Sequence, residues 1–245
     1  MDLVPVVPDL FLLQFGVGNA YLLVGADGLT LVDCGLPGSG PAIADAIRML
    51  GHHPADLLRL VLTHFHADHA GAAAEITGWG QVAVIAHAAE APVICGRQAG
   101  PPPDLAGWER PLFEQVTSQL PAAQPAPVPV AREVTDGDEL DLGGTTATVL
   151  AVPGHTPGSI GLYFGARQLL LTGDTVARAP DGRVMPGVFN VDRPAAAASF
   201  RRLAALDADI ACFGHGAPLT GRAGAILRVT AGLAGHSSSP RRPFS

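Results

Sequence analysis

The chain has 245 residues, a formal net charge of −7 and 48% hydrophobic residues, but only 5% aromatic residues. This length and apolar content allow a large aliphatic core without disulfides, and the acidic balance argues against nucleic acid and anionic membranes as partners. Every basic residue is arginine, so a catalytic lysine is excluded.

Strands and helices are expected to alternate through the first third of the chain. Three apolar runs separated by glycine-containing turns indicate antiparallel strands at 10–15, 20–24 and 29–32. A helical pattern then occupies 40–50, and an apolar run at 58–63 predicts a buried strand. Polar residues that follow this strand will therefore lie at the edge of a sheet.

An inserted segment is expected near the middle of the chain. Helical spacing over 68–76 and a buried strand at 82–86 come first. From 97 to 130 the composition changes: prolines cluster at both edges and confine one short amphipathic helix between extended segments. We interpret 97–130 as a cap inserted into the fold.

The second half repeats the order of the first, with strands followed by helices. Strands are predicted near 139–142, 145–152, 159–164, 168–171 and 209–213, and helices at 194–206 and 222–233. Two such sets favour an α/β fold in which two packed sheets carry helices outside, a four-layer αββα sandwich. We expect one domain over 1–236 and a flexible tail at 237–245.

The segment most typical of chemistry is His64-Phe65-His66-Ala67-Asp68-His69, directly after a predicted strand. Three imidazoles and a carboxylate this close are costly to bury together unless a cation compensates them. Imidazole and carboxylate are the usual ligands of zinc. In an extended loop, residues two apart point the same way, so one short loop can begin two metal sites.

Three further candidate ligands each follow a predicted strand and stand beside glycine or proline. They are His155 in Pro-Gly-His-Thr-Pro-Gly-Ser, Asp174 in Gly-Asp-Thr, and His215 in Gly-His-Gly. Glycine and proline there allow tight turns and a close approach of the backbone. These side chains are therefore expected to converge on the His64–His69 segment.

As a set, these motifs resemble the metallo-β-lactamase-fold hydrolases, in the branch that contains lactonases and glyoxalase II, from about 33 to 215. The resemblance implies the αββα fold and two metal ions. It assigns the first ion to His64, His66 and His155, the second to Asp68, His69 and His215, and a bridging role to Asp174.

The resemblance also implies the cofactor and a supporting residue. The two divalent ions are expected to be zinc, with iron and manganese as alternatives. Asp33 in Leu-Val-Asp-Cys-Gly matches a position that supports the metal loop, where a carboxylate can orient a ligand imidazole by accepting its other N–H. A plain turn aspartate is the alternative for Asp33.

The mechanism expected from two such ions is hydrolysis. Two cations about 3.5 to 4 Å apart can share a water, lower its pKa towards 7 and present hydroxide to a carbonyl carbon. Asp68 is the catalytic candidate that orients this nucleophile and carries a proton to the leaving group. No serine or cysteine nucleophile is required.

Departures from subfamily patterns narrow the expected substrate. Typical zinc β-lactamases carry cysteine or serine where this chain has Asp174, which leaves β-lactam hydrolysis at most a minor activity. Glyoxalase II relatives recognise glutathione partly through a basic helical extension, and the 30 residues that follow His215 here are too few for one. Lactonases place a tyrosine after the bridging aspartate, whereas Tyr21 and Tyr163 both precede Asp174 here. We expect a small ester, lactone or thioester as substrate.

Two alternatives stay open for the function. Some proteins that resemble this sequence bind one iron and oxidise persulfides, so a mononuclear iron dioxygenase is the second candidate. A non-catalytic metal-binding protein is the third. The content of bound metal and turnover on a substrate panel distinguish the three.

The expected partner is a small molecule, without nucleic acid or membrane. No signal sequence and no apolar run of spanning length is visible, so a cytoplasmic location is expected. Cys34, Cys95 and Cys212 are widely spaced and imply no disulfide framework. The 97–130 segment is either a substrate lid or a contact between two copies in a homodimer.

Overall fold

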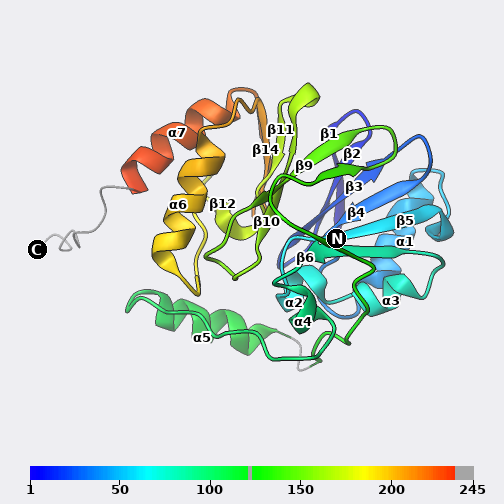
Figure 1. The fold of residues 1–245 in the computed structure, drawn as a ribbon, viewed down its shortest axis with the longest axis horizontal. Coiled ribbons are helices and arrows are strands. Elements are labelled where there is room, and N and C mark those ends of the chain that lie inside the picture. Colours follow the sequence, from blue (N-terminus) through cyan, green and yellow to red (C-terminus); the bar gives the residue numbers. More distant parts are fainter. Residues whose placement is uncertain (121–122, 235–245) are drawn as a thin grey trace, which may run out of the picture.

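The computed structural model describes residues 1–120 and 123–234, so the expected tail at 237–245 lies outside the described residues. Two β-sheets pack against each other at its centre, and helices cover both outer faces (Figure 1). The predicted four-layer α/β sandwich is confirmed.

The first sheet has its strands in chain order. They are β1 (Asp2–Val7), β2 (Leu10–Gln14), β3 (Asn19–Val24), β4 (Leu29–Val32), β5 (Leu57–Leu62), β6 (Ala83–His87) and β7 (Arg132–Val134). Pairing is antiparallel from β1 to β4 and parallel from β4 to β7. The carboxyl ends of β4 and β5 therefore lie side by side.

The second sheet has the order β15-β14-β11-β10-β9-β8. Its strands are β8 (Glu139–Asp141), β9 (Thr146–Ala151), β10 (Ile160–Phe164), β11 (Leu169–Leu171), β14 (Ile210–Cys212) and β15 (Leu219–Thr220). Only β11 and β14 pair in parallel. A separate hairpin joins β12 (Val176–Arg178) to β13 (Val184–Pro186).

Seven α-helices and three 3-10 turns complete the described chain. The helices are α1 (Gly40–Met49), α2 (Ala67–Ala70), α3 (Ala73–Thr77), α4 (Ala91–Ile94), α5 (Glu109–Gln119), α6 (Arg193–Ala204) and α7 (Ala223–Ala234); the turns are η1 (Pro54–Asp56), η2 (Gly165–Arg167) and η3 (Gly173–Thr175). Most of the predicted strands and helices are found within two residues of the expected bounds.

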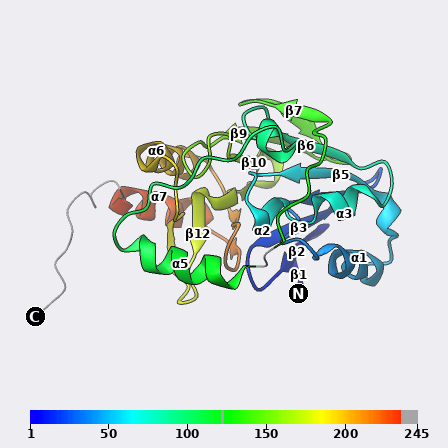
Figure 2. The same cartoon turned by 90° about the horizontal axis from the view of Figure 1, so that it is seen from below.

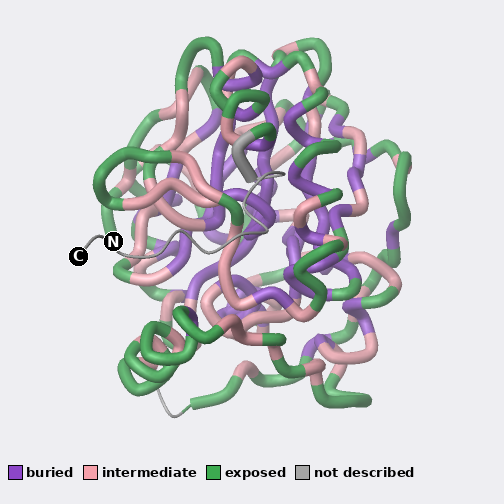
Figure 3. The backbone as a smooth tube through the Cα atoms, turned by 90° about the vertical axis from the view of Figure 1, so that its left-hand side faces the viewer, coloured by how far each residue is buried: buried purple, intermediate pink, exposed green. Residues whose placement is uncertain are grey.

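Three apolar clusters fill the spaces between the four layers. One joins the first sheet to α1 and α3 and includes Ile43 and Ile47, the helix face that the spacing predicts. The second lies between the sheets, and the third joins the second sheet to α6 and α7 through Phe200 and Leu227. Burial is concentrated in this interior, while the outer turns are exposed (Figure 3).

The helix expected over 68–76 is two short helices, α2 and α3. The carbonyl oxygen of His69 accepts the backbone N–H of Cys34 at 2.7 Å, which removes it from the helical hydrogen-bond pattern. At Gly71 a Cβ would overlap the ring of Pro37, so the chain packs there at a closeness that only glycine allows. The break is therefore imposed by packing against the loop after β4.

Several short strands were not predicted, and β1 shows why. β1 contains Pro5, which cannot donate a ladder hydrogen bond, and its pairing with β2 shifts register between Pro5 and Val7. Proline is tolerated there because β1 is an edge strand. β7, β12, β13 and β15 have at most three residues each, too few for a period to show.

The predicted insertion contains one helix, α5, flanked by extended segments. It lies at the end of the molecule where α2 and α4 also lie (Figures 1 and 2). Glu109 at its start is buried, and its carboxylate accepts the backbone N–H groups of Ala106 and Phe189. Trp108 and Leu112 are exposed, whereas Phe113 packs edge-on against Phe189.

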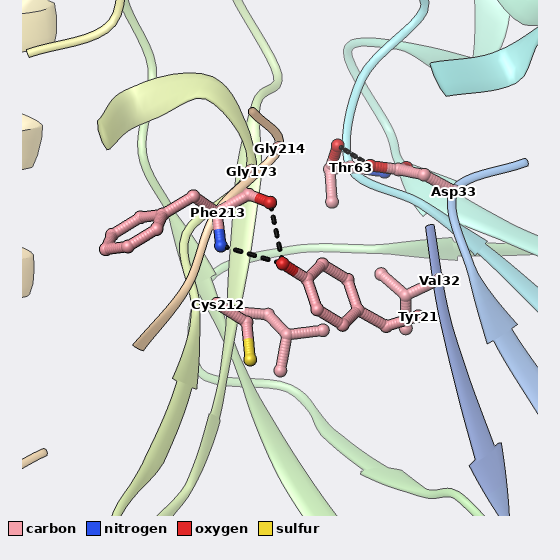
Figure 4. Close-up of a pocket in the computed structure, with 9 residues that line it drawn as sticks. Tyr21, Val32, Asp33, Thr63, Gly173, Cys212, Phe213 and Gly214 are labelled. Atoms are coloured by element: carbon pink, nitrogen blue, oxygen red, sulfur yellow. Dashed lines mark hydrogen bonds between the residues drawn. The ribbon is translucent and has the colours of Figure 1, made fainter. Parts of the chain in front are cut away.

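One tyrosine joins the two sheets. Tyr21 on β3 donates its hydroxyl hydrogen to the carbonyl of Phe213 at 2.8 Å and accepts the N–H of the same residue at 3.0 Å (Figure 4). Asn19 donates its amide to the same carbonyl at 3.0 Å. These bonds fix the chain just after β14, two residues before His215, against the first sheet.

No helix among the described residues has the length and apolar character needed to cross a bilayer. The longest helices, α6 and α7, have 12 residues each and are amphipathic covers of the second sheet.

We predict that Tyr21→Phe lowers the free energy of unfolding by about 1–3 kcal/mol, because it leaves the buried N–H of Phe213 without its acceptor. Tyr163→Phe is the matched control, since its hydroxyl donates to the carbonyl of Asp207 at an exposed site. Urea unfolding measures both. Equal losses in the two variants would contradict a specific contribution from the contact between the sheets.

Candidate metal centre

The seven predicted ligands lie at one edge of the sandwich, where strands of both sheets end. His64 and His66 follow β5, and Asp68 and His69 lie in α2. From the second sheet, His155 follows β9, Asp174 follows β11 and His215 follows β14. In α/β sheets the carboxyl ends of strands are the usual place for ligands.

The structure brings all seven side chains together in three overlapping groups. Within each group the possible ligand atoms lie within 4.8 Å of one another; the groups are His64, His66 and His155; His64, His69 and Asp174; and Asp68, His69 and His215. The first and third are the two triads that the resemblance implies, and the middle group connects them.

Asp174 occupies the position between the two triads. Its Oδ2 lies 3.5 Å from His155 Nε2 and 3.1 Å from His215 Nε2, while Oδ1 lies 3.3 Å from His69 Nε2. Gly214 is needed for this placement, because a Cβ there would overlap Asp174 Oδ1. One carboxylate therefore faces ligands of both triads, which is the arrangement of a bridging ligand.

The protonation of His64 follows from its hydrogen-bond partners. Thr63 Oγ1 donates its single hydrogen to Asp33 Oδ2 at 2.7 Å, so it must accept from His64 Nδ1 at 3.0 Å. The proton of His64 is therefore on Nδ1, and its Nε2 lone pair points into the centre. His155 is oriented in the same way, because its Nδ1 lies 3.1 Å from the carbonyl of Val188.

Several polar atoms at this centre have no hydrogen-bond partner within the described residues. In the described part of the chain, His64 Nε2, His69 Nε2 and Asp174 Oδ1 are buried without a hydrogen-bond partner. His66 Nδ1 and His155 Nε2 lie 2.9 Å apart, within hydrogen-bond distance of each other. Buried polar atoms without a partner are unfavourable unless a cation lies among them, so the histidine and aspartate set fits divalent metal.

Burial and neighbouring carboxylates shift the pKa values of the site histidines in opposite directions. Burial lowers the pKa of His64 well below its usual value and that of His66 to about 3. Burial acts in the same direction on His69 and His215, but Asp174 and other carboxylates outweigh it, raising the pKa of His69 well above its usual value and that of His215 to about 10. A bound metal would replace these protons.

Asp33 holds the first loop of the site from behind. Its backbone has φ of 60°, a left-handed conformation that directs the carboxylate at the loop after β5. It accepts the N–H of Thr63 at 2.8 Å and Nδ1–H of His69 at 2.9 Å. The expected orienting contact with a ligand imidazole is thus present in the structure. Figure 4 shows the bond between Asp33 and Thr63.

Sequence reasoning missed Glu90, a buried carboxylate that contacts the loop of the first ligands. Its Oε2 accepts the N–H of Phe65 at 2.8 Å, between His64 and His66. The available signal was weak, namely one acidic residue in the apolar stretch that follows β6. Cys34 and Cys212, also near the site, are buried as expected for small apolar residues.

We predict that Asp33→Asn weakens metal binding by about 10- to 100-fold, because an amide cannot accept all three hydrogen bonds that the carboxylate accepts. Competition with a chromophoric chelator measures the affinity. Asp27→Asn is the control, since Asp27 pairs with Arg59 at the surface. Unchanged affinity in Asp33→Asn would contradict the orienting role.

Solved structures share this fold. A metallo-beta-lactamase family protein of Thermus thermophilus superposes with a TM-score of 0.69 at 25% identity, over 95% of this chain and 80% of that one. BJP-1, a subclass B3 metallo-beta-lactamase of Bradyrhizobium japonicum, has a TM-score of 0.71 at 24% identity over 96% and 91% of the two chains. At that identity, BJP-1 shows the fold alone.

Sequence relatives are hydrolases by name. "Probable metallo-hydrolase YflN" of Bacillus subtilis (strain 168) is 30% identical over 210 residues, 78% of this chain and 76% of that protein. A hydroxyacylglutathione hydrolase of Cereibacter sphaeroides (strain ATCC 17025 / ATH 2.4.3) is 32% identical over 184 residues. That match covers 74% of this chain but only 55% of the relative.

A family model also matches most of the chain. The metallo-beta-lactamase superfamily model aligns with residues 13–215, which begin within β2, end at His215 and include every candidate ligand. The matched segment also contains the loop of Asp33 and the whole insertion. On its fold, its histidine and aspartate cluster and this match, the chain belongs to the metallo-beta-lactamase superfamily, as a metallo-hydrolase.

Proposed function

We propose that this chain is a dinuclear metal-dependent hydrolase that cleaves small esters, lactones or thioesters. The observation that carries the proposal is the position of Asp174, whose carboxylate faces His155 of the first triad and His69 and His215 of the second. A site with three ligands on each side of one carboxylate is suited to two ions. Relatives named hydroxyacylglutathione hydrolase support hydrolysis of an acyl bond.

When bound, two divalent cations, for which zinc is the first candidate, would supply a water of lowered pKa and would polarise a carbonyl oxygen. The chain itself supplies ligands and proton transfer. Asp68 contacts His69 and His215 through Oδ2, at 3.5 and 3.3 Å. Its Oδ1 is left to accept a hydrogen bond from water and to carry a proton to the leaving group.

A cavity beside the first triad supports a small apolar substrate. It has a volume of about 390 Å³ and reaches His66, with walls formed by α2, α4 and the segment 124–128. No charged side chain lines it, and Phe65, Val93 and Ile94 supply apolar surface. The size is near the lower end of the roughly 300–1,000 Å³ typical of small-ligand pockets. We assign it to the uncharged acyl part of the substrate.

Elemental analysis and a substrate panel test the function. We predict two divalent ions per chain and turnover of lactones or thioesters, which a chelator abolishes. At full metal loading, Asp68→Asn should lower kcat by about 10²–10⁴-fold, because the amide cannot accept a proton. Asp45→Asn, at an exposed site on α1, is the control that should keep full activity.

Other outcomes of the same experiment would contradict the proposal. One iron per chain with oxygen uptake on persulfides would identify a dioxygenase instead. Two metals with no turnover on any ester, lactone, thioester or β-lactam would favour a non-catalytic metal-binding protein. Turnover of β-lactams alone would contradict the assignment of the substrate.

The cavity predicts a dependence on acyl length. From acetyl to hexanoyl esters, kcat/KM should rise about fourfold per methylene, since each buried CH₂ contributes about 0.8 kcal/mol. Val93→Trp should abolish this rise and leave acetyl turnover unchanged, because the indole fills the cavity. Val229→Trp, on the exposed face of α7, is the matched control. If kcat/KM of the wild-type protein does not change with acyl length, the assignment of the cavity to the acyl part is wrong.

A further inference from the structure

Glu90 is a fully buried carboxylate that is not itself a candidate metal ligand. It follows β6 and lies just before α4. Its Oε2 accepts the N–H of Phe65 at 2.8 Å. Its Oε1 accepts the N–H of Gly158 at 2.7 Å and the hydroxyl of Thr156 at 2.9 Å. One carboxylate thus receives three hydrogen bonds.

The three donors come from two loops that belong to different sheets. Phe65 follows β5 of the first sheet and separates His64 from His66. Thr156 and Gly158 lie in the turn between β9 and β10 of the second sheet, directly after His155. Glu90 therefore ties together the two loops that carry the whole first triad, in which His66 Nδ1 and His155 Nε2 lie 2.9 Å apart.

No arginine or histidine of the described chain forms an ion pair with Glu90. Burial raises its pKa, and the hydrogen bonds from Thr156, Gly158 and Phe65 act in the opposite direction. A buried carboxylate without a cation is expensive for stability alone. A carboxylate is nevertheless the group suited to accept hydrogen bonds from three donors in two loops, since it offers two acceptor oxygens and no donor.

The second triad is held by different contacts. The side chain of His69 donates from Nδ1 to Asp33, and the backbone N–H of His69 donates to the carbonyl of His66 at the start of α2. The carbonyl of His215 accepts the N–H of Arg178 at 3.0 Å. None of these bonds involves Glu90. Loosening the Glu90 contacts should therefore affect the first triad and leave the second in place.

We propose that Glu90 is a positioning residue for the first metal site, which sets the separation of His66 and His155 by joining their two loops. The role depends on the metal centre alone and not on the substrate of the proposed hydrolase. Failure of every substrate assay would leave it standing, and its own failure would leave the hydrolase proposal standing.

Single-site backgrounds test the proposal by metal affinity. His215→Ala keeps the first triad whole, and His155→Ala keeps the second. Zinc competition against a chromophoric chelator gives the Kd in each background, with and without Glu90→Gln. The amide must turn its NH₂ towards a donor, either Phe65 or the Gly158 side, so at least one bond of the clamp is lost.

We predict that Glu90→Gln raises the Kd about 10- to 100-fold in the His215→Ala background and less than threefold in the His155→Ala background. Glu75→Gln is the matched control, because Glu75 accepts the N–H groups of Gly38 and Gly40 away from the ligands. It should leave both Kd values unchanged. Equal weakening in both backgrounds, or none in either, overturns the proposal.

Two further measurements keep the test decisive if Glu90→Gln does not fold. Thr156→Val removes one donor of the clamp and should weaken the first site alone, whereas Thr156→Ser, which keeps the hydroxyl, should restore it. In the metal-free protein, hydrogen exchange at the N–H groups of Phe65 and Gly158 should accelerate in Thr156→Val and not in Glu75→Gln. Unchanged exchange and unchanged affinity in Thr156→Val contradict the role.

Discussion

The structure depends on holding many electron-pair donors together at one point. Seven histidine and aspartate side chains direct nitrogen and oxygen atoms at a common centre. Among the described residues, several of these atoms are buried without a hydrogen-bond partner. In the chain alone this arrangement is unfavourable, because buried polar atoms are left without hydrogen-bond partners. The rest of the fold must supply the stability that the site lacks.

The sandwich meets this demand through contacts that run between its halves. Each triad takes ligands from both sheets, so any sliding of one sheet over the other would pull the members of each triad apart. Tyr21 and Asn19 bind the carbonyl of Phe213, and Glu90 binds both metal loops of the first triad. Each contact uses a polar side chain buried at the edge of the core, where a fixed partner is worth most.

The sequence was informative where local pattern decides structure and uninformative where distant packing does. Apolar runs located the main strands, and the ligands stood out because histidine and aspartate followed those runs beside glycine. The break between α2 and α3 was missed because it depends on Cys34 and Pro37, which lie more than 30 residues away. Glu90 was missed for the same reason, since its partners are 25 to 68 residues distant.

The insertion is coupled to the metal centre through its docking contacts. Glu109 accepts the N–H of Phe189, and Phe113 packs against the same residue. Next to it, the carbonyl of Val188 fixes the proton-bearing nitrogen of His155. A change that shifts α5 would therefore move Phe189 and the neighbouring Val188, and with them the ring of His155. Because the same segment supplies the 124–128 wall of the cavity, the shape of the cavity and the orientation of His155 are linked through it.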